Sequence, residues 1–297
     1  MRAEHVDLLR QALPYINRFK NKVFVIKIGG DIADEDPTLM SFCEEIALLV
    51  QVGIRTVVVH GGGKQATELS EKLGIEPRII NGRRVTDDRT LDVVKMTFAG
   101  LINTEILGAL RKYGIAAVGL SGVDGNIVHA TRRPPKRVLN EETGRSEVVD
   151  FGHVGDIDRI DDRLLKVLLD ADYVPVIASL GADDEGHVFN INADTVASSV
   201  ARALGAEKLI LASDVEGIYK GDEGSREMIQ RATVDEVKGL IKSGVIRGGM
   251  VPKAQSAIEA LGKGVGSVHI INGMRPSSLL TEVFTDNGCG TMLYRGT

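Results

Sequence analysis

The chain has 297 residues, of which 43% are hydrophobic and 26% charged, a composition typical of a folded globular protein. Its formal net charge of −5 argues against a broad nucleic-acid-binding or membrane-binding surface, because both partners attract basic proteins. The sequence has no run of about 18 uninterrupted apolar residues, and Cys43 and Cys289 show no metal-binding spacing. We therefore expect a soluble protein of the reducing cytoplasm.

Residues 1–20 form the first predicted element. In EHVDLLRQALPYINRFK, apolar residues such as Leu9, Leu13 and Ile16 are spaced as on one face of a helix. Pro14 lies inside this pattern and predicts a kinked or broken helix, because proline removes a backbone hydrogen bond. The apolar stripe indicates packing on its own domain or, alternatively, on a partner subunit.

The rest of the chain alternates between short β-branched runs and helical patterns. The runs are KVFVIKIGG, RTVVVHGGG, AAVGLSGVDG, YVPVIASLG, KLILASDVEG and SVHIING. Amphipathic helices are predicted at 87–112, 161–171, 194–204 and 251–262. Strands that alternate with helices, and that are apolar enough to be covered on both faces, predict an open and mostly parallel sheet. Residues 126–152 break this rhythm and indicate a protruding hairpin.

The stretch VVVHGGGKQATELSEKLG places three glycines between a strand and a helix. Such a loop lets the backbone approach a negatively charged group. It is not a P-loop, because Gln65 stands where that motif needs Ser or Thr. Gly61, Gly63 and Ala66 match the dinucleotide fingerprint, but the acidic residue needed about 20 positions later is missing. A dinucleotide oxidoreductase is thus a weak alternative.

Four charged residues near glycines or strand ends each have an ordinary structural interpretation. Lys27 in VFVIKIGG could lie on a solvated strand face, and Lys253 in GGMVPKAQ could be a surface lysine. Asp194 in NINAD is interpreted as a helix N-cap, and Asp214 in LILASDVEG as a turn residue at a strand end. Taken singly, none of these residues predicts a function.

Taken together, these residues lie in motifs that resemble one family. VIKIGG, VVVHGGG, NGRRVT, GHVGDI, NINAD, SDVEGIY and GGMVPK occur in this order and spacing in the amino-acid kinase family. The chain is most similar to members that phosphorylate N-acetyl-L-glutamate in the second step of arginine biosynthesis. The resemblance implies a three-layer αβα sandwich in a single domain, residues 1–297. Within it, 1–20 would be the N-terminal helix, 21–205 the acyl-amino-acid-binding lobe and 206–297 the nucleotide-binding lobe.

The resemblance also implies roles for the charged residues. Lys27 and Lys253 would lie on opposite sides of the transferring phosphoryl group, and Asp194 would orient both. ATP would be the co-substrate, with Mg²⁺ held by phosphates and water rather than by protein ligands. The acceptor is a carboxylate that is already ionised near pH 7, so the reaction needs positioned positive groups rather than a general base.

Substrate and nucleotide contacts follow from the same resemblance. Residues expected at the acceptor are Gly62, Gly63, Arg84 and Asn190. Residues expected at the nucleotide are Ser213, Asp214, Gly217, Tyr219 and Arg247. The glycines would offer backbone N–H groups, and Arg84 would hold a substrate carboxylate.

Arginine-inhibited members carry an extra N-terminal kinked helix that joins dimers into a hexamer, and residues 3–20 resemble it. L-Arginine is thus an expected inhibitor, in a homo-oligomer of dimers, and its candidate contacts are Tyr15, His269, Glu282 and Gly288. Two alternatives on the same fold stay open. One is a kinase for an N-blocked α-aminoadipate, and the other is a non-catalytic arginine sensor.

Overall fold

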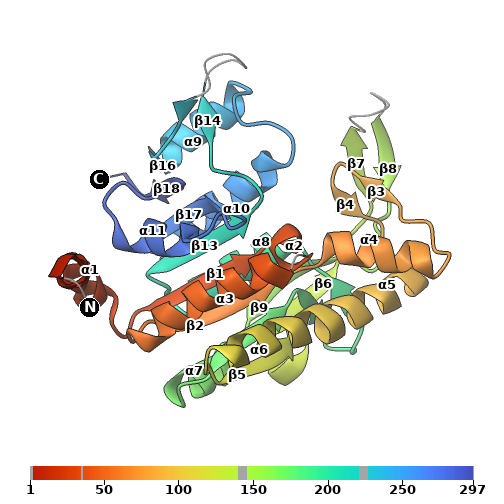
Figure 1. Ribbon diagram of the computed structural model, residues 1–297. Helices are drawn as coiled ribbons and strands as arrows, with labels where there is room; N and C mark the ends of the chain where they lie inside the picture. The colour runs from red at the N-terminus through yellow and green to blue at the C-terminus, as the bar shows by residue number, and fades with distance from the viewer. Residues whose placement is uncertain (1–2, 35, 140–145, 221–226, 297) are drawn as a thin grey trace.

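A central sheet organises the protein in the computed structural model, which describes residues 3–34, 36–139, 146–220 and 227–296 (Figure 1). Among these residues, eight strands pair in the following spatial order: β16 (Arg231–Thr233), β18 (Thr291–Tyr294), β17 (Ser267–Asn272), β13 (Lys208–Ser213), β1 (Val23–Ile28), β2 (Arg55–His60), β10 (Val174–Ala178) and β5 (Ala117–Ser121). Every neighbouring pair is parallel except β17 and β18. The predicted open, mostly parallel sheet is confirmed.

Helices cover both faces of this sheet, as Figure 1 shows. Those on one face are α2 (Gly30–Asp34), α3 (Asp36–Gln51), α6 (Asn103–Lys112) and α11 (Ser278–Phe284). Those on the other are α7 (Arg163–Asp170), α8 (Ala193–Ala203), α9 (Val234–Lys242) and α10 (Met250–Gly262). Because strand side chains alternate between faces, Phe24 and Ile26 pack under α3 while Val25 packs under α8 and α10. The three-layer αβα architecture is confirmed.

The predicted helix at 87–112 is continuous but not uniform. It comprises α5 (Asp88–Lys95), a π-helical segment η1 (Met96–Ile102) and α6, and the carboxylate of Asp87 caps its first turn. By length and composition this helix could cross a membrane, but half of its apolar window is buried. Phe98 and Ile106 belong to the hydrophobic core, so it is an internal helix of the fold.

Smaller sheets project from the central layer. A second sheet has the order β12 (Val188–Asn190), β11 (Leu180–Ala182), β6 (Val128–Arg132) and β9 (Gly155–Ile160). The two-stranded pairs are β3 (Ile79–Ile80) with β4 (Arg83–Arg84), β7 (Lys136–Leu139) with β8 (Ser146–Val149), and β14 (Tyr219–Lys220) with β15 (Glu227–Met228).

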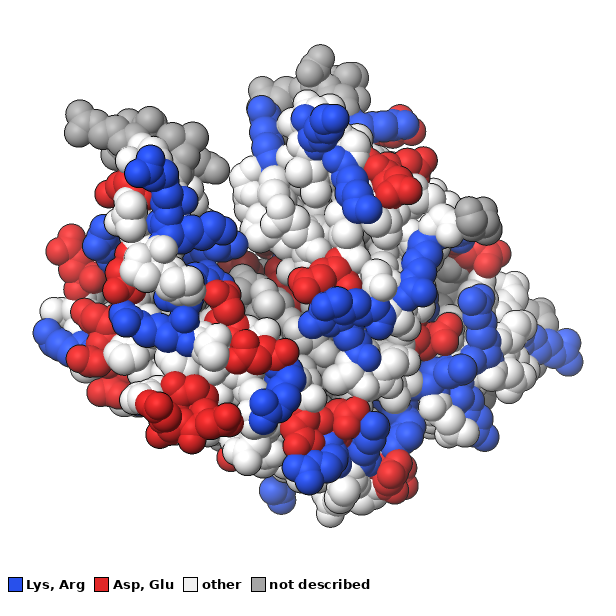
Figure 2. Space-filling model, turned by 180° about the vertical axis from the view of Figure 1, so that it is seen from behind, with Lys and Arg blue, Asp and Glu red and all other residues white. Residues whose placement is uncertain are grey.

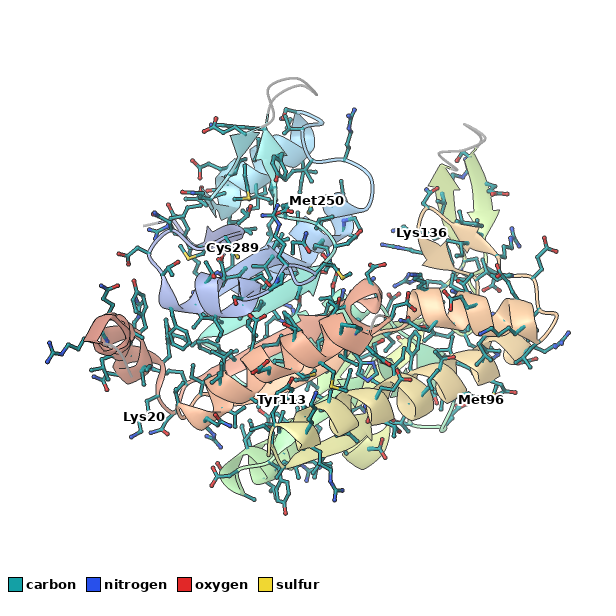
Figure 3. All side chains as sticks on the ribbon, in the orientation of Figure 1. Lys20, Met96, Tyr113, Lys136, Met250 and Cys289 are labelled. Carbon is teal, nitrogen blue, oxygen red and sulfur yellow. The ribbon has the colours of Figure 1, made fainter. Side chains whose placement is uncertain are left out.

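The hairpin predicted at 126–152 is correct only for its outer part, β7 and β8, where Lys136 lies (Figure 3). The beginning of that segment, β6, pairs instead with β9, because Val128 and Ala130 are buried in the core.

The N-terminal helix α1 (Ala3–Phe19) runs through Pro14, so the break predicted as one of two possibilities is absent. Its end is anchored, because Phe19 is buried and its ring meets Phe24 edge-on at 5.3 Å between centroids. The alternative prediction, a kink at Pro14, stays a prediction. Lysines and arginines are interspersed with acidic residues on the face in Figure 2, in line with the small net charge.

Candidate active site

The predicted site residues gather where parallel strands of the central sheet end. Strands β1, β2 and β13 run side by side in register, so Gly29, Gly61 and Asp214 follow them at the same edge. The carboxyl edge of a parallel sheet is where open α/β folds bind ligands. A Cβ on Gly29 would lie 3.1 Å from the Cα of Ser213, so the loop after β1 touches the end of β13.

A cavity of about 600 Å³ opens at this edge, and we call it the glycine-loop cavity. It has the size of an ordinary small-molecule site. Its lining includes Lys27, Gly61, Gly62, Gly63, Arg84, Ser179, Asn190 and Pro252. Lys27 and the four predicted acceptor contacts are thus brought together by the fold.

One carboxylate joins the two predicted lysines. Asp194 lies in the first turn of α8, where its Oδ1 is 3.0 Å from the Nζ of Lys27 and its Oδ2 accepts from the Nζ of Lys253 at 3.0 Å. The three side chains are only 11–12% exposed. Lys27 shares a strand face with Val25, below α8, and Lys253 lies in the first turn of α10. Neither lysine is a solvated surface residue, so the structural interpretation that each had on its own is wrong. We call this group the Lys–Asp–Lys bridge.

The electrostatics of the bridge are set by burial and by charge. Burial would raise the pKa of Asp194, but the ammonium groups of Lys27 and Lys253 outweigh it and hold that pKa well below its usual range. Burial and the charge of Lys27 lower the pKa of Lys253, while Asp194 and Asp214 oppose this shift. The carboxylate therefore stabilises two positive charges that would otherwise repel each other.

Asp194 is not the N-cap of α8, as the sequence had suggested. That position belongs to Asn192, whose side chain accepts a hydrogen bond from the N–H of Thr195. An N-cap carboxylate would be committed to backbone N–H groups. Because Asn192 takes this role two residues earlier, both oxygens of Asp194 are left for the lysines.

The glycine loop is held very close to the long helix. A Cβ on Gly62 would lie 2.1 Å from Cδ1 of Ile102 and 3.0 Å from the ring of Phe98, so only glycine fits. Helix α4 (Gly63–Lys72) starts directly at the loop, and no described side chain caps it. Its first N–H groups and its helix dipole therefore favour an anion at this point.

Arg84 and Asn190 flank the loop from other elements. The Nη2 of Arg84 donates to the carbonyl of Gly63 at 2.7 Å and to Oγ1 of Thr67 at 2.5 Å. Its Nη1 is buried and has no partner among the described residues. Asn190, at the end of β12, donates from Nδ2 to Oγ1 of Thr86 at 3.2 Å. An unpaired guanidinium nitrogen beside a cavity suits a ligand carboxylate.

Two further residues were missed by the sequence analysis, one in the cavity and one behind the glycine loop. Ser179 is fully buried directly after β10, and its Oγ has no partner among the described residues. Gln65 donates to the carbonyl of Gly30 at 2.8 Å and so links the loops after β1 and β2. The glycines of VIKIGG and VVVHGGG were a sequence signal for the contact between Gln65 and Gly30. Ser179 gave none, because its place depends on β10 lying next to β2.

The residues predicted at the nucleotide lie around the end of β13 and beyond. Ser213 ends this strand, and Asp214 lies near enough to Lys253 to raise its pKa. A Cβ on Gly217 would lie 2.6 Å from Oγ1 of Thr291, and Tyr219 begins β14. Arg247 is exposed in the connection between α9 and α10. None of these five predicted residues lines the glycine-loop cavity in the described part of the chain.

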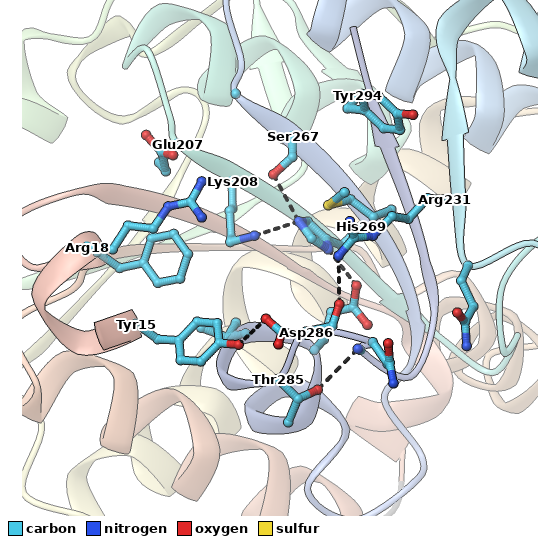
Figure 4. A pocket seen from close by; sticks show the side chains of 18 residues that line it. Tyr15, Arg18, Glu207, Lys208, Arg231, Ser267, His269, Thr285, Asp286 and Tyr294 are labelled. Carbon is cyan, nitrogen blue, oxygen red and sulfur yellow. Dashed lines mark hydrogen bonds and ion pairs between the residues drawn. The ribbon is translucent and has the colours of Figure 1, made fainter. Parts of the chain in front are cut away.

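The four predicted arginine contacts line a second cavity, of about 480 Å³ (Figure 4). Within it the Nζ of Lys208 lies 2.9 Å from Nε2 of His269, whose Nδ1 lies 2.6 Å from Oε1 of Glu282. Tyr15 bonds to Asp286 across this cavity. Burial lowers the pKa of Lys208 to about 8. Lys208 was not predicted, although it lies in the quoted strand KLILAS.

Within the described ranges, no group of three or more His, Cys, Asp or Glu side chains is arranged to hold a metal ion. Both oxygens of Asp194 already face ammonium groups. The residues at this site therefore do not form a protein-built magnesium cage.

The structure is a mostly parallel αβα sandwich in which one carboxylate joins two lysines beside a glycine loop, and its similarity to curated kinases defines an enzyme of the kinase class. The chain belongs to the amino acid kinase family, which matches residues 22–272. Over 292 residues it is 44% identical to "Acetylglutamate kinase" of Methanocaldococcus jannaschii, covering 98% of this chain and 97% of that relative. The predicted family is confirmed, and a kinase implies ATP as the phosphoryl-donating co-substrate.

Solved structures give the same fold. N-acetylglutamate synthase from Neisseria gonorrhoeae, complexed with coenzyme A and N-acetyl-glutamate, has a TM-score of 0.84 and 31% identity over 98% of this chain. This chain spans 64% of that longer synthase. The synthase complexed with coenzyme A and L-arginine has a TM-score of 0.81 and 29% identity, covering 98% of this chain and 66% of that one.

Proposed function

We propose that the protein transfers the γ-phosphoryl group of ATP to the γ-carboxylate of N-acetyl-L-glutamate. The products would be N-acetyl-L-glutamyl 5-phosphate and ADP, in the second step of arginine biosynthesis in the cytoplasm. The observation that carries this proposal is the Lys–Asp–Lys bridge beside the glycine loop. The acceptor is supported by the name of the relative at 44% identity and by the similar synthase that was solved with N-acetyl-glutamate.

The proposed reaction brings one anion against another. The acceptor carboxylate is ionised at neutral pH, so it needs no general base to attack the phosphorus. Lys27 and Lys253 would flank the transferring group and offset its charge, while Asp194 fixes the direction of both ammonium groups. The N–H groups of Gly62 and Gly63 would add neutral donors at the same point. Catalysis would therefore rest on positioning and fixed charge.

Acceptor recognition is proposed for the lobe of residues 21–205. The free Nη1 of Arg84 would pair with the α-carboxylate of the acceptor, and the amide of Asn190 would bond near its acetamido group. Buried Ser179 adds a hydroxyl to the same cavity, and this hydroxyl has no partner in the described part of the chain. A cavity with these donors suits a small dicarboxylate better than a neutral acceptor.

The nucleotide is proposed to lie over residues 206–297, against the turn from Ser213 to Tyr219 and near Arg247. Asp214 and Lys253 lie at the junction between this region and the bridge. ATP is expected as its Mg²⁺ complex, with the ion held by phosphates and water, because both oxygens of Asp194 already face the ammonium groups of Lys27 and Lys253.

A substrate panel tests the proposed reaction. Hydroxylamine traps acyl phosphates, so each carboxylate acceptor can be compared by the hydroxamate formed with ATP and Mg²⁺, and UMP by the release of ADP. N-acetyl-L-glutamate is expected to give the highest kcat/KM among acetylglutamate, glutamate, aspartate, carbamate, UMP and acetylaminoadipate. One methylene group separates the first from the last, which is worth roughly 10–200-fold. A preference for acetylaminoadipate would establish the alternative kinase, and no acyl phosphate with any acceptor would favour a sensor.

L-Arginine is proposed to bind in the second cavity and to inhibit the enzyme. Arginine carries two cationic groups and one carboxylate, and the cavity offers both charges. Glu282 and Asp286 supply carboxylates, while Lys208 and Arg231 supply cations. The similar synthase structure complexed with L-arginine supports this choice of ligand.

The chain is also proposed to form a homo-oligomer, a dimer that assembles further into a trimer of dimers. Apolar side chains on the outer surface support this, since Met96 and Leu101 on η1 are each 51% exposed and Leu13 on α1 is 49% exposed. Figure 3 labels Met96 on the long helix. Helix α1 would join dimers, and the long helix would form the dimer contact.

Millimolar arginine is expected to inhibit the kinase, and Glu282→Gln to raise the half-inhibiting concentration more than about tenfold. That factor corresponds to the loss of one charged hydrogen bond, about 1.5–3 kcal/mol. Glu236→Gln, in the capping box of α9 and outside this cavity, is the matched control. Activity and arginine titrations measure the response, and sedimentation measures the assembly. An unchanged response in Glu282→Gln would place arginine elsewhere, and a plain dimer would contradict the trimer of dimers.

A further inference from the structure

We propose that His60 is a positioning residue, which holds the carbonyl of Gly61 and thereby aims the N–H of Gly62 into the glycine-loop cavity. The inference deepens the proposed function and rests on it, because the N–H of Gly62 matters only if an anion reacts there. Among the described residues, His60 is not part of the lining of the cavity, and it is fully buried at the end of β2.

The hydrogen bonds of His60 assign its tautomer. Its Nδ1 lies 2.9 Å from the carbonyl oxygen of Gly61, and its Nε2 lies 3.1 Å from Nδ2 of Asn103. The amide nitrogen of Asn103 also faces the carbonyls of Val176 at 3.0 Å and Leu120 at 3.3 Å. Because carbonyl oxygens can only accept, these two carbonyls fix the orientation of the amide, with its nitrogen toward His60. Nε2 therefore accepts, and the imidazole proton must lie on Nδ1, where it donates to Gly61.

This hydrogen bond sets the direction of the next N–H. Within the described residues no peptide bond is cis, and in a trans peptide the C=O and N–H groups point in opposite directions. His60 draws the carbonyl of Gly61 toward the interior of the protein. The N–H of Gly62, in the same peptide plane, then points away from the interior and toward the cavity that Gly62 lines.

The π-helical segment holds the same loop from the other side. It brings Phe98 and Ile102 against Gly62, and Asn103 follows directly, where it reaches His60. A Cβ on Gly119 would lie 2.1 Å from Oδ1 of Asn103, so a glycine on β5 leaves room for this amide. Such π-helical turns often occur at functional sites. The side chains of Phe98, Ile102 and Asn103 thus fix the glycine loop in one orientation.

The buried imidazole is suited to hold a position rather than to transfer protons. Burial lowers the pKa of His60 to about 4, so the ring is neutral near pH 7. A neutral ring keeps Nε2 available as the acceptor for Asn103. It also adds no charge to a site in which Lys27 and Lys253 already provide two.

Two substitutions of His60 separate its donor from its bulk. In His60→Asn, the amide nitrogen overlies Nδ1 and can still donate to Gly61. In His60→Gln, the amide oxygen can overlie Nε2 and accept from Asn103, but the donor to Gly61 is lost. We expect His60→Gln to lower kcat roughly 10²-fold with little change in the KM for ATP. His60→Asn should recover most of that loss.

Thr97→Val is the matched control, because Thr97 is buried in η1 and its hydroxyl donates only within the helix, to the carbonyl of Val93 at 2.8 Å. Its kcat should equal that of the unaltered enzyme. Thermal unfolding of each variant shows whether it is folded. Equal losses in His60→Asn and His60→Gln, or an unaffected His60→Gln, would overturn the inference.

Two further measurements do not depend on the acceptor. In ¹⁵N-histidine NMR of the full chain, the resonance that disappears in His60→Gln should be a neutral ring protonated at Nδ1. In a crystal structure of His60→Gln, the peptide between Gly61 and Gly62 should be rotated. An Nε2-protonated ring or an unmoved carbonyl would overturn the inference even if the unaltered enzyme failed to phosphorylate acetylglutamate. That failure alone would count only against the proposed function.

Discussion

Replacing Asp194 by asparagine is expected to lower kcat by roughly 10²–10³-fold, the loss typical of removing one charge-stabilising group from an active site. The carboxylate now receives Lys27 on one oxygen and Lys253 on the other, both at 3.0 Å. An amide has a single acceptor oxygen, so one ammonium group would face a donor instead. Leaving buried charges without a partner also costs stability, about 3–5 kcal/mol.

The Asp194→Asn variant should also change two pH dependences. Burial and the charge of Lys27 lower the pKa of Lys253, whereas the charge of Asp194, its hydrogen bond and the charge of Asp214 raise it. Without Asp194, Lys253 loses its proton at lower pH, so the alkaline limb of kcat/KM should move to lower pH. The alkaline limb moves in this direction because the reaction needs Lys253 in its charged form.

Stability should respond at the acid end. The pKa of Asp194 is held well below its usual range, so its ionised form stabilises the fold above the unfolded pKa of about 3.9. This contribution is lost as the pH falls through the folded pKa. The unaltered protein should therefore exceed Asp194→Asn in unfolding free energy by the largest amount at neutral pH. This difference should become smaller below about pH 4.

Denaturant unfolding and initial rates over a pH series measure these effects. Asp170→Asn is the matched control, because Asp170 pairs with Arg55 at the surface and is 72% exposed. A surface pair is worth little, so this variant should keep its rate and stability. An Asp194→Asn enzyme with near-normal kcat would contradict the role proposed for the bridge.

Much of this arrangement could be predicted from local sequence. Strand runs that end in glycine or aspartate predicted the parallel sheet, and the ordered motifs predicted the family. The alternation of side chains along VFVIKI even fixes the face of Lys27, which it shares with Val25. Because the carboxyl ends of parallel strands meet at one edge, the motifs after β1, β2 and β13 had to come together.

The residues that were missed depend on contacts between distant elements. Ser179 meets the glycine loop only because β10 is the neighbour of β2, and the sequence does not state this strand order. Asn103 reaches His60 through a π-helical segment, which follows no apolar periodicity. The prediction of Asp194 as the N-cap was wrong because Asn192, two positions earlier, is an equally good capping residue and takes that place. Propensity alone could not choose between them.

Replacing Lys27 by arginine is expected to lower kcat by about 10²–10³-fold, although the charge is kept. Lys27 is a compact ammonium group, 12% exposed, between β1 and the first turn of α8. A guanidinium group is larger and planar, and it prefers to bind both oxygens of a carboxylate at once. In that geometry it would take Oδ2 of Asp194 from Lys253, so both cations would be displaced from the transferring group.

The matched control for Lys27→Arg is Lys22→Arg, just before the same strand, where the lysine side chain is 54% exposed and 3.9 Å from Glu207. Initial rates at saturating ATP and acetylglutamate give kcat, and substrate titrations give both KM values. The loss should fall on kcat more than on either KM, because the ammonium group is needed most where charge develops on the transferring phosphoryl group. Rates close to those of Lys22→Arg would show that any cation suffices at this position. In that case the positioning argument for the whole bridge would fail, because it depends on the compact shape of the lysine as well as on its charge.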